Sequence, residues 1–157
     1  MNKELREYAD KIILPFLEKI EYPKSVKIFI DDLRECPEGW ILFRDGESFL
    51  TWRIMYPDVA IDVISFDHDL GEMYHSGYEI VKYMVDMEQV NTDNIRKIMF
   101  HTDNLIGLKN MYFYLINAQK HGQISKDIII ESQKRNCIDG KFSFSPYKVA
   151  DINGKFL

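Results

Sequence analysis

The sequence predicts an α/β protein with a doubly wound, five-stranded parallel sheet of strand order 2-1-3-4-5. Five short apolar runs are rich in β-branched and aromatic residues, as buried strands are. Segments in which apolar residues recur at helical spacing separate several of these runs, and such alternation favours a parallel sheet with helices on both faces. Three of the runs end abruptly in polar residues, as strands do where a sheet of this kind binds ligands.

The strands are expected where the apolar runs are shortest and most β-branched. They cover residues 26–30, 40–44, 59–66, 96–100 and 127–130. The connection over residues 34–40 is expected to be a loop, because Pro37 and Gly39 interrupt regular structure. The segments 71–77 and 101–107 are also predicted to be loops.

Three helices are expected between the strands, over residues 46–55, 78–87 and 108–121. In the first, Phe49, Leu50 and Ile54 lie on one side, and Pro57 closes the segment. The second has apolar residues at the 3.6-residue period, and Gly122 ends the third.

The whole chain, residues 1–157, is expected to be a single domain, with a core over residues 26–130. Residues 1–22 are predicted to be an N-terminal helical extension, because apolar residues recur at roughly helical spacing over 3–20. Pro15 is expected to kink or divide that helix. Residues 131–157 are expected to be an irregular tail, in which 141–149 form either an edge strand or an extended wrap.

The composition limits the function classes. With 46% hydrophobic residues the chain can build a sizeable core, and its net charge of −5 argues against a broad grip on duplex nucleic acid. Cys36 and Cys137 form no zinc pattern and are expected to be free thiols. No apolar run approaches the ~20 residues that span a membrane, and the charged N-terminus is unlike a signal peptide. We therefore expect a cytoplasmic protein without membrane contact.

The polar residues that end three of the strands are the main functional signal. In the order 2-1-3-4-5, the first and third strands are neighbours and the fourth lies beside the third, so their carboxyl ends should converge. The residues at these ends are Asp31 and Asp32; Asp67, His68 and Asp69; and His101, Thr102, Asp103 and Asn104.

Several carboxylates at one sheet edge repel one another unless a positive group joins them. A divalent cation is the simplest such group, and Mg²⁺ prefers oxygen ligands and commonly combines one or two carboxylates with a substrate phosphate. The nearby imidazoles shift the preference slightly toward Mn²⁺ or another transition metal. The candidate ligands are Asp31, Asp32, Asp67 and Asp69.

Several stretches of the sequence together resemble one family. "FIDDLRECPEGW", "LFRDGES", "ISFDHDLG", "SGYEI" and "FHTDN" occur in the order and spacing of the cyclic-phosphate processing receiver-like domain, a divergent branch of the response-regulator receiver fold. The resemblance covers residues 26–130. It implies a receiver-like sheet in which Asp31, Asp32 and Asp67 bind a metal ion, and action on cyclic phosphates such as 2′,3′-cyclic RNA ends or related nucleotides. Arg34, His68, Asp69 and His101 match residues that this family adds.

The chain departs from ordinary receivers at two places. His101 precedes Thr102 where receivers end the fourth strand with Ser or Thr. The lysine that receivers place just after the fifth strand has only Lys134 or Arg135 as counterparts, a few residues later. Both departures count against phosphotransfer signalling. Leu105 also stands where the family's motif has a proline.

The first hypothesis is therefore a metal-dependent phosphoesterase, a hydrolase that opens a cyclic phosphate at Asp67 and its neighbours. His101 or His68 would transfer protons, and Arg34 and Arg44 would hold the phosphate. Thr102 and Asn104 complete the candidate substrate-binding residues.

Each assignment has a structural alternative. Asp31, Asp32 and Asp69 either bind metal or cap a turn. His68 and His101 either transfer protons or are structural residues. Arg34 either holds phosphate or forms a salt bridge to the acidic cluster; Arg44 is otherwise a surface residue. Thr102 and Asn104 otherwise bond only the loop backbone. The competing functions are a signalling module phosphorylated on Asp67 and a nucleotide-binding module without turnover.

Overall fold

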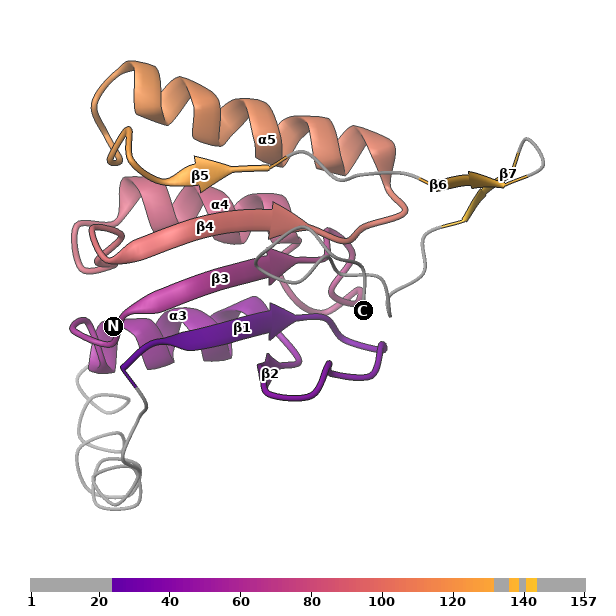
Figure 1. Ribbon diagram of the computed structural model, residues 1–157, viewed down its shortest axis with the longest axis horizontal. Coiled ribbons are helices and arrows are strands. Elements are labelled where there is room, and N and C mark those ends of the chain that lie inside the picture. The colour runs from indigo at the N-terminus through magenta and orange to yellow at the C-terminus, as the bar shows by residue number, and fades with distance from the viewer. Residues whose placement is uncertain (1–23, 132–135, 139–140, 144–157) are drawn as a thin grey trace.

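The computed structural model describes residues 24–131, 136–138 and 141–143. Its central feature is a five-stranded, all-parallel sheet of order β2-β1-β3-β4-β5 (Figure 1), which confirms the predicted fold class and strand order. The strands are β1 (Val26–Ile30), β2 (Ile41–Phe43), β3 (Ile61–Phe66), β4 (Ile95–Phe100) and β5 (Ile129–Ile130). The strands β2, β3 and β5 are shorter than predicted, since only part of each apolar run pairs with a neighbour.

The helices begin at side chains that cap their first turns. Asp45 accepts a hydrogen bond from the Ser48 N–H and starts α3 (Gly46–Met55), which has the bounds predicted for it. A capping box formed by Ser76 and Glu79 starts α4 (Gly77–Asp86).

The start of α5 (Leu105–Lys120) corrects a prediction. Residues 105–107 were expected to belong to a loop but form the first turn of this helix. The physical reason is Asn104, whose side-chain oxygen accepts a hydrogen bond from the Gly107 N–H at 2.8 Å and so caps the helix earlier.

The three helices pack against one face of the sheet. Strand side chains on that face form a continuous core with them and include Ile28, Ile30, Ile64, Phe66, Ile98 and Phe100. Side chains alternate along each strand, so Phe29, Val63 and Met99 lie on the opposite face, where they pack with Trp40 and Leu42. Within the described residues, helices therefore cover one of the two faces, whereas the sequence predicted helices on both.

The predicted N-terminal helix lies outside the described residues, and so does most of the tail. Of the tail, β6 (Asn136–Ile138) and β7 (Lys141–Ser143) pair antiparallel in a separate two-stranded sheet. Residues 141–143 are therefore a strand, but not at an edge of the main sheet. Among the described residues, no helix has both the length and the apolar character needed to cross a membrane.

Candidate metal centre

The carboxyl ends of β1, β3 and β4 bring the predicted site residues together. Each strand is extended by one backbone hydrogen bond into the site: the Asp31 N–H donates to Phe43 O at 3.1 Å, Asp67 to Ile30 O at 3.0 Å and His101 to Phe66 O at 3.0 Å. The first residue after each strand is thus held by the neighbouring strand. These backbone hydrogen bonds fix the directions in which the side chains of Asp31, Asp67 and His101 leave the backbone.

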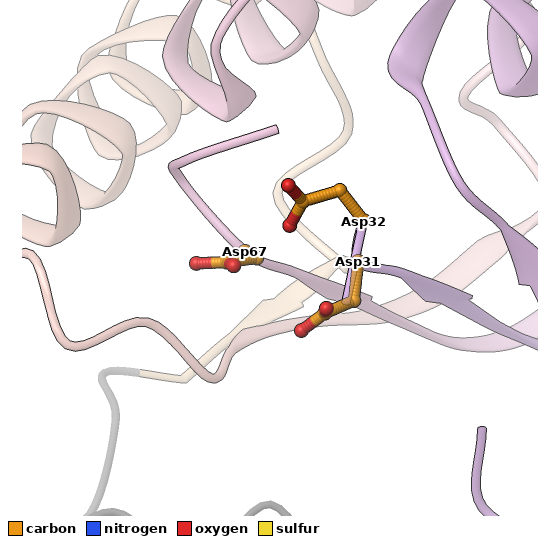
Figure 2. Close-up of side chains that lie close together, drawn as sticks. All are labelled: Asp31, Asp32 and Asp67. Carbon is orange, nitrogen blue, oxygen red and sulfur yellow. The ribbon is translucent and has the colours of Figure 1, made fainter. Parts of the chain in front are cut away.

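Asp31, Asp32 and Asp67 form a compact acidic cluster (Figure 2). One carboxylate oxygen from each lies within 4.8 Å of the others. Asp31 and Asp67 are buried and Asp32 is partly exposed. Among the described residues, Asp69 is not part of this cluster, although the sequence analysis placed it among the candidate ligands.

The surroundings of the carboxylates differ. Burial alone would raise the pKa of Asp31, but hydrogen bonds from His101, Arg34 and the Leu33 backbone outweigh it and hold this pKa well below its usual range. Burial raises the pKa of Asp32, and the negative charges of Asp31 and Asp67 add to that effect. Asp31 is therefore ionised at neutral pH, and a nearby cation would favour the ionised form of Asp32.

The guanidinium of Arg34 lies against the cluster. Its Nη1 atom is 2.8 Å from Asp31 Oδ2 and 2.9 Å from Asp67 Oδ2, and its Nη2 is 3.0 Å from Asp103 Oδ2. An all-oxygen donor set of this size suits Mg²⁺ or Mn²⁺. The cluster fits such a cation provided that Arg34 gives up one or both Oδ2 atoms.

This arrangement predicts competition between Arg34 and a metal ion. Arg34→Met removes the positive charge that the carboxylates now share, so we expect the mutant to bind Mg²⁺ at least about tenfold more tightly than the wild type. Isothermal titration calorimetry with MgCl₂ measures this. Arg44→Met is the matched control: it removes the same charge nearby, but its guanidinium contacts backbone oxygens, Arg34 O at 2.7 Å and Asp31 O at 3.3 Å. Equal affinities for the Arg34 mutant and the wild type would contradict the competition.

His101 lies behind Asp31 and is fully buried. Its Nε2 is 3.0 Å from Asp31 Oδ2, its Nδ1 is 2.6 Å from Ser65 Oγ, and its ring stacks on Phe29 with centroids 4.1 Å apart. Burial lowers the pKa of His101. These contacts orient Asp31.

His68 lies on the other side of the cluster. Its backbone N–H donates to Asp67 Oδ1 at 2.7 Å, and its Nδ1 is 2.9 Å from Asp69 Oδ1. The amide of Asn104 also reaches Asp69, at 3.3 Å, and lies 3.2 Å from His68 Nδ1. We assign the imidazole proton to Nδ1, because a carboxylate accepts it at the shorter distance. Nε2 is then the basic nitrogen.

Gly107 makes room for this imidazole. A Cβ at Gly107 would lie 2.2 Å from His68 Cδ2, so any larger residue at the start of α5 would displace the ring. Gly77 makes room for the backbone of residues 67 and 68. Its N–H donates to His68 O at 2.7 Å, and a Cβ at Gly77 would lie 2.1 Å from Asp67 O. The loop that follows Asp67 therefore returns to its own starting point at residue 77.

Three candidate substrate-binding residues have mainly structural contacts. Arg44 ties down the backbone of the β1–β2 loop. Thr102 is fully buried and its hydroxyl accepts from the Asn104 N–H at 3.2 Å, while Asn104 caps α5. Their binding of a substrate stays a prediction.

A pocket of about 670 Å³ opens beside the cluster. Of the residues predicted for the site, Asp32, Arg34, Asp67 and Asp69 line it, and neither histidine is among its described lining residues. Several further lining residues had no predicted role. These are Leu33, Leu70, Gly71, Glu72, Tyr74, Ser76 and Asp103. Asp103 could have been predicted to lie at the site, because it follows the end of β4 by three residues. Tyr74 could not, because a loop residue shows no periodicity in the sequence.

A family match covers the part of the chain that forms this site. The model of a family described as the cyclic-phosphate processing receiver domain matches residues 26–117. No curated protein and no solved structure matches the chain. The match spans β1 through most of α5 and thus includes every residue of the acidic cluster.

Proposed function

Since the chain belongs to the cyclic-phosphate processing receiver domain family, we propose that it is a metal-dependent phosphoesterase that opens cyclic phosphates, either 2′,3′-cyclic RNA ends or related nucleotides. The observation that carries the proposal is the cluster of Asp31, Asp32 and Asp67 beside a pocket of about 670 Å³. A buried acidic cluster in a receiver-like sheet supports a cation site, and a cation beside an open pocket supports phosphate chemistry.

In this proposal Asp31, Asp32 and Asp67 hold the cation. When bound, a divalent cation supplies polarisation of a phosphoryl oxygen and a lowered pKa for an attacking water. Asp31 is prepared for this role by His101, which we propose is a positioning residue and not a proton carrier, because it is fully buried behind the carboxylate.

Arg34 supplies the contact with the phosphate. Its planar guanidinium already contacts three carboxylates, those of Asp31 and Asp67 through Nη1 and that of Asp103 through Nη2, and its fork of N–H donors suits a bidentate contact with phosphate oxygens. When Arg34 exchanges a carboxylate partner for a phosphate, its positive charge stays paired with a negative group.

His68 is the proposed proton carrier. Asp69 accepts from its Nδ1 and so directs Nε2 to act as the acceptor. Its side chain is 18% exposed, in contrast to that of His101, so it can exchange protons with water.

A nucleotide-binding module without turnover is the second candidate. It is favoured by the absence of histidine from the described residues that line the pocket, since an acid–base group must reach the scissile bond. The two functions share every metal and phosphate contact, so turnover itself distinguishes them.

The test is turnover with and without metal. The purified protein is incubated with 2′,3′-cyclic and 3′,5′-cyclic nucleotides in Mg²⁺, in Mn²⁺ and in chelator, and products are followed by phosphorus NMR. We expect ring opening to a phosphate monoester in at least one metal and its complete loss in chelator. Nucleotide binding without ring opening, on protein shown to be folded by circular dichroism, would replace the enzyme with the binding module.

A further inference from the structure

The pocket beside the acidic cluster has a polar side and an apolar side. Asp32, Asp67 and Arg34 form the polar side, and Leu33 and Tyr74 form the apolar one. Leu33 is 84% exposed and Tyr74 is 56% exposed. Single exposed apolar residues are common on protein surfaces, but two that border one pocket beside a candidate phosphate site form a surface for the apolar part of a ligand.

The two sides of the pocket are adjacent. Gly71 turns the chain with φ of +91°, and the Tyr74 N–H donates back to Gly71 O at 3.4 Å. A Cβ on Gly71 would lie 3.7 Å from Tyr74 Cδ2 and 3.8 Å from Asp32 Oδ2. The aromatic ring and a carboxylate of the cluster thus both lie close to one backbone position, so a single small ligand can reach both.

The loop that carries Tyr74 is anchored on its C-terminal side. The His75 N–H donates to Glu47 Oε1 at 3.1 Å, the Ser76 N–H to Glu79 Oε2 at 2.8 Å and the Gly77 N–H to His68 O at 2.7 Å. The exposed ring therefore stands on a backbone with defined hydrogen bonds. A surface of this kind binds a planar group with little loss of conformational freedom.

The charges of the pocket limit the size of the ligand. Its described lining includes five carboxylates, those of Asp32, Asp67, Asp69, Glu72 and Asp103, whereas Arg34 is the one cationic side chain among these lining residues. A polynucleotide needs a cationic contact for each of several phosphates. A ligand with one phosphate needs only the cation site and Arg34.

We propose that Tyr74 and Leu33 form a nucleobase subsite, and that the substrate is a mononucleoside cyclic phosphate whose base stacks on Tyr74. This inference rests on the proposed function, because it takes the phosphate to lie at the acidic cluster. Every base presents a π face, so stacking on Tyr74 gives affinity with little base discrimination. It distinguishes a nucleotide from a cyclic phosphate that carries no base.

The test compares two ligands that need no turnover, adenosine 3′-monophosphate and inorganic phosphate, in Mg²⁺ and in Mn²⁺. Dissociation constants are measured by NMR titration of labelled protein. We expect Tyr74→Ala to weaken nucleotide binding about 5- to 100-fold, the range that corresponds to loss of one stacked base. Inorganic phosphate should bind Tyr74→Ala and the wild type equally, and Tyr74→Phe should retain nucleotide affinity. Phe113→Ala is the matched control, because Phe113 is also 56% exposed but lies on α5 and does not line the pocket.

The outcomes separate this inference from the proposed function. Unchanged nucleotide affinity in Tyr74→Ala would overturn the subsite while phosphate binding continued to support the acidic site. Weakened nucleotide affinity in Tyr74→Ala, in a protein that fails to bind inorganic phosphate, would support the subsite and count against the phosphoesterase. Failure of both ligands to bind the folded wild type in either metal would overturn both.

Discussion

Asp67→Asn is expected to reduce the affinity for Mg²⁺ or Mn²⁺ by about 100-fold or more while the protein stays folded. Loss of an outer partner of a metal ligand typically costs 10- to 100-fold in affinity, and loss of a ligand costs at least as much. Asparagine has nearly the same shape, and its oxygen can still accept from the His68 N–H as Asp67 Oδ1 does. Cation-induced stabilisation in thermal unfolding measures the effect, because a ligand that binds only the folded state raises the melting temperature.

Asp103→Asn is the matched control for this mutation. Asp103 also pairs with Arg34, at 3.0 Å, and also lines the pocket, but its side chain is 71% exposed and does not belong to the cluster. The same loss of charge there should change cation affinity only a few-fold, as expected for an exposed charge in high dielectric. A cation effect in Asp67→Asn equal to that in Asp103→Asn would show that Asp67 is not a ligand.

Arg53→Met is expected to destabilise the fold by about 3 kcal/mol or more, since each buried acceptor left unpaired costs about 1–3 kcal/mol. Arg53 is fully buried and donates to Asn91 O at 2.8 Å, Val59 O at 2.6 Å and Tyr56 O at 3.1 Å, as well as to the side chain of Asn94. It thereby joins the end of α3 to the loops that precede β3 and β4. Burial lowers the pKa of Arg53 to about 10, which leaves it charged at neutral pH.

Denaturant unfolding of Arg53→Met measures this loss, with Arg96→Met as its control. Arg96 is an arginine on β4, but it is exposed and pairs with Asp62 at the surface, so its loss should cost less than about 1 kcal/mol. Equal stabilities of the two mutants would mean that the carbonyls around residue 53 find other partners.

The parallel sheet could be predicted because each strand is a short β-branched run and a helix precedes β3, β4 and β5. The bounds of α3 were also predictable, because Asp45 and Pro57 mark its two ends. The start of α5 was not. Asn104 was predicted to bind substrate. Only the structure shows that its side chain also accepts a hydrogen bond from the Gly107 N–H and caps the helix.

The acidic cluster was predictable for a similar reason. Parallel strands end at one edge, and residues directly after them converge whatever the details of packing. The contacts of the side chains were not predictable. His101 and Thr102 follow β4 directly but are fully buried, and His101 packs against Phe29 and Ser65. Burial at a strand end depends on tertiary packing and leaves no periodic mark in the sequence.

The hydrogen bond from Gly77 to His68 has a consequence for evolution. It closes the loop that carries Tyr74 at its base, next to Asp67, so the two ends of that loop are fixed independently of what lies between them. The entropic cost of closing a loop grows only slowly with its length, by roughly 0.6 kcal/mol for each doubling. Insertions and substitutions between residues 70 and 75 can therefore accumulate without moving the carboxylates. Relatives with the same acidic cluster are free to diverge in what they recognise.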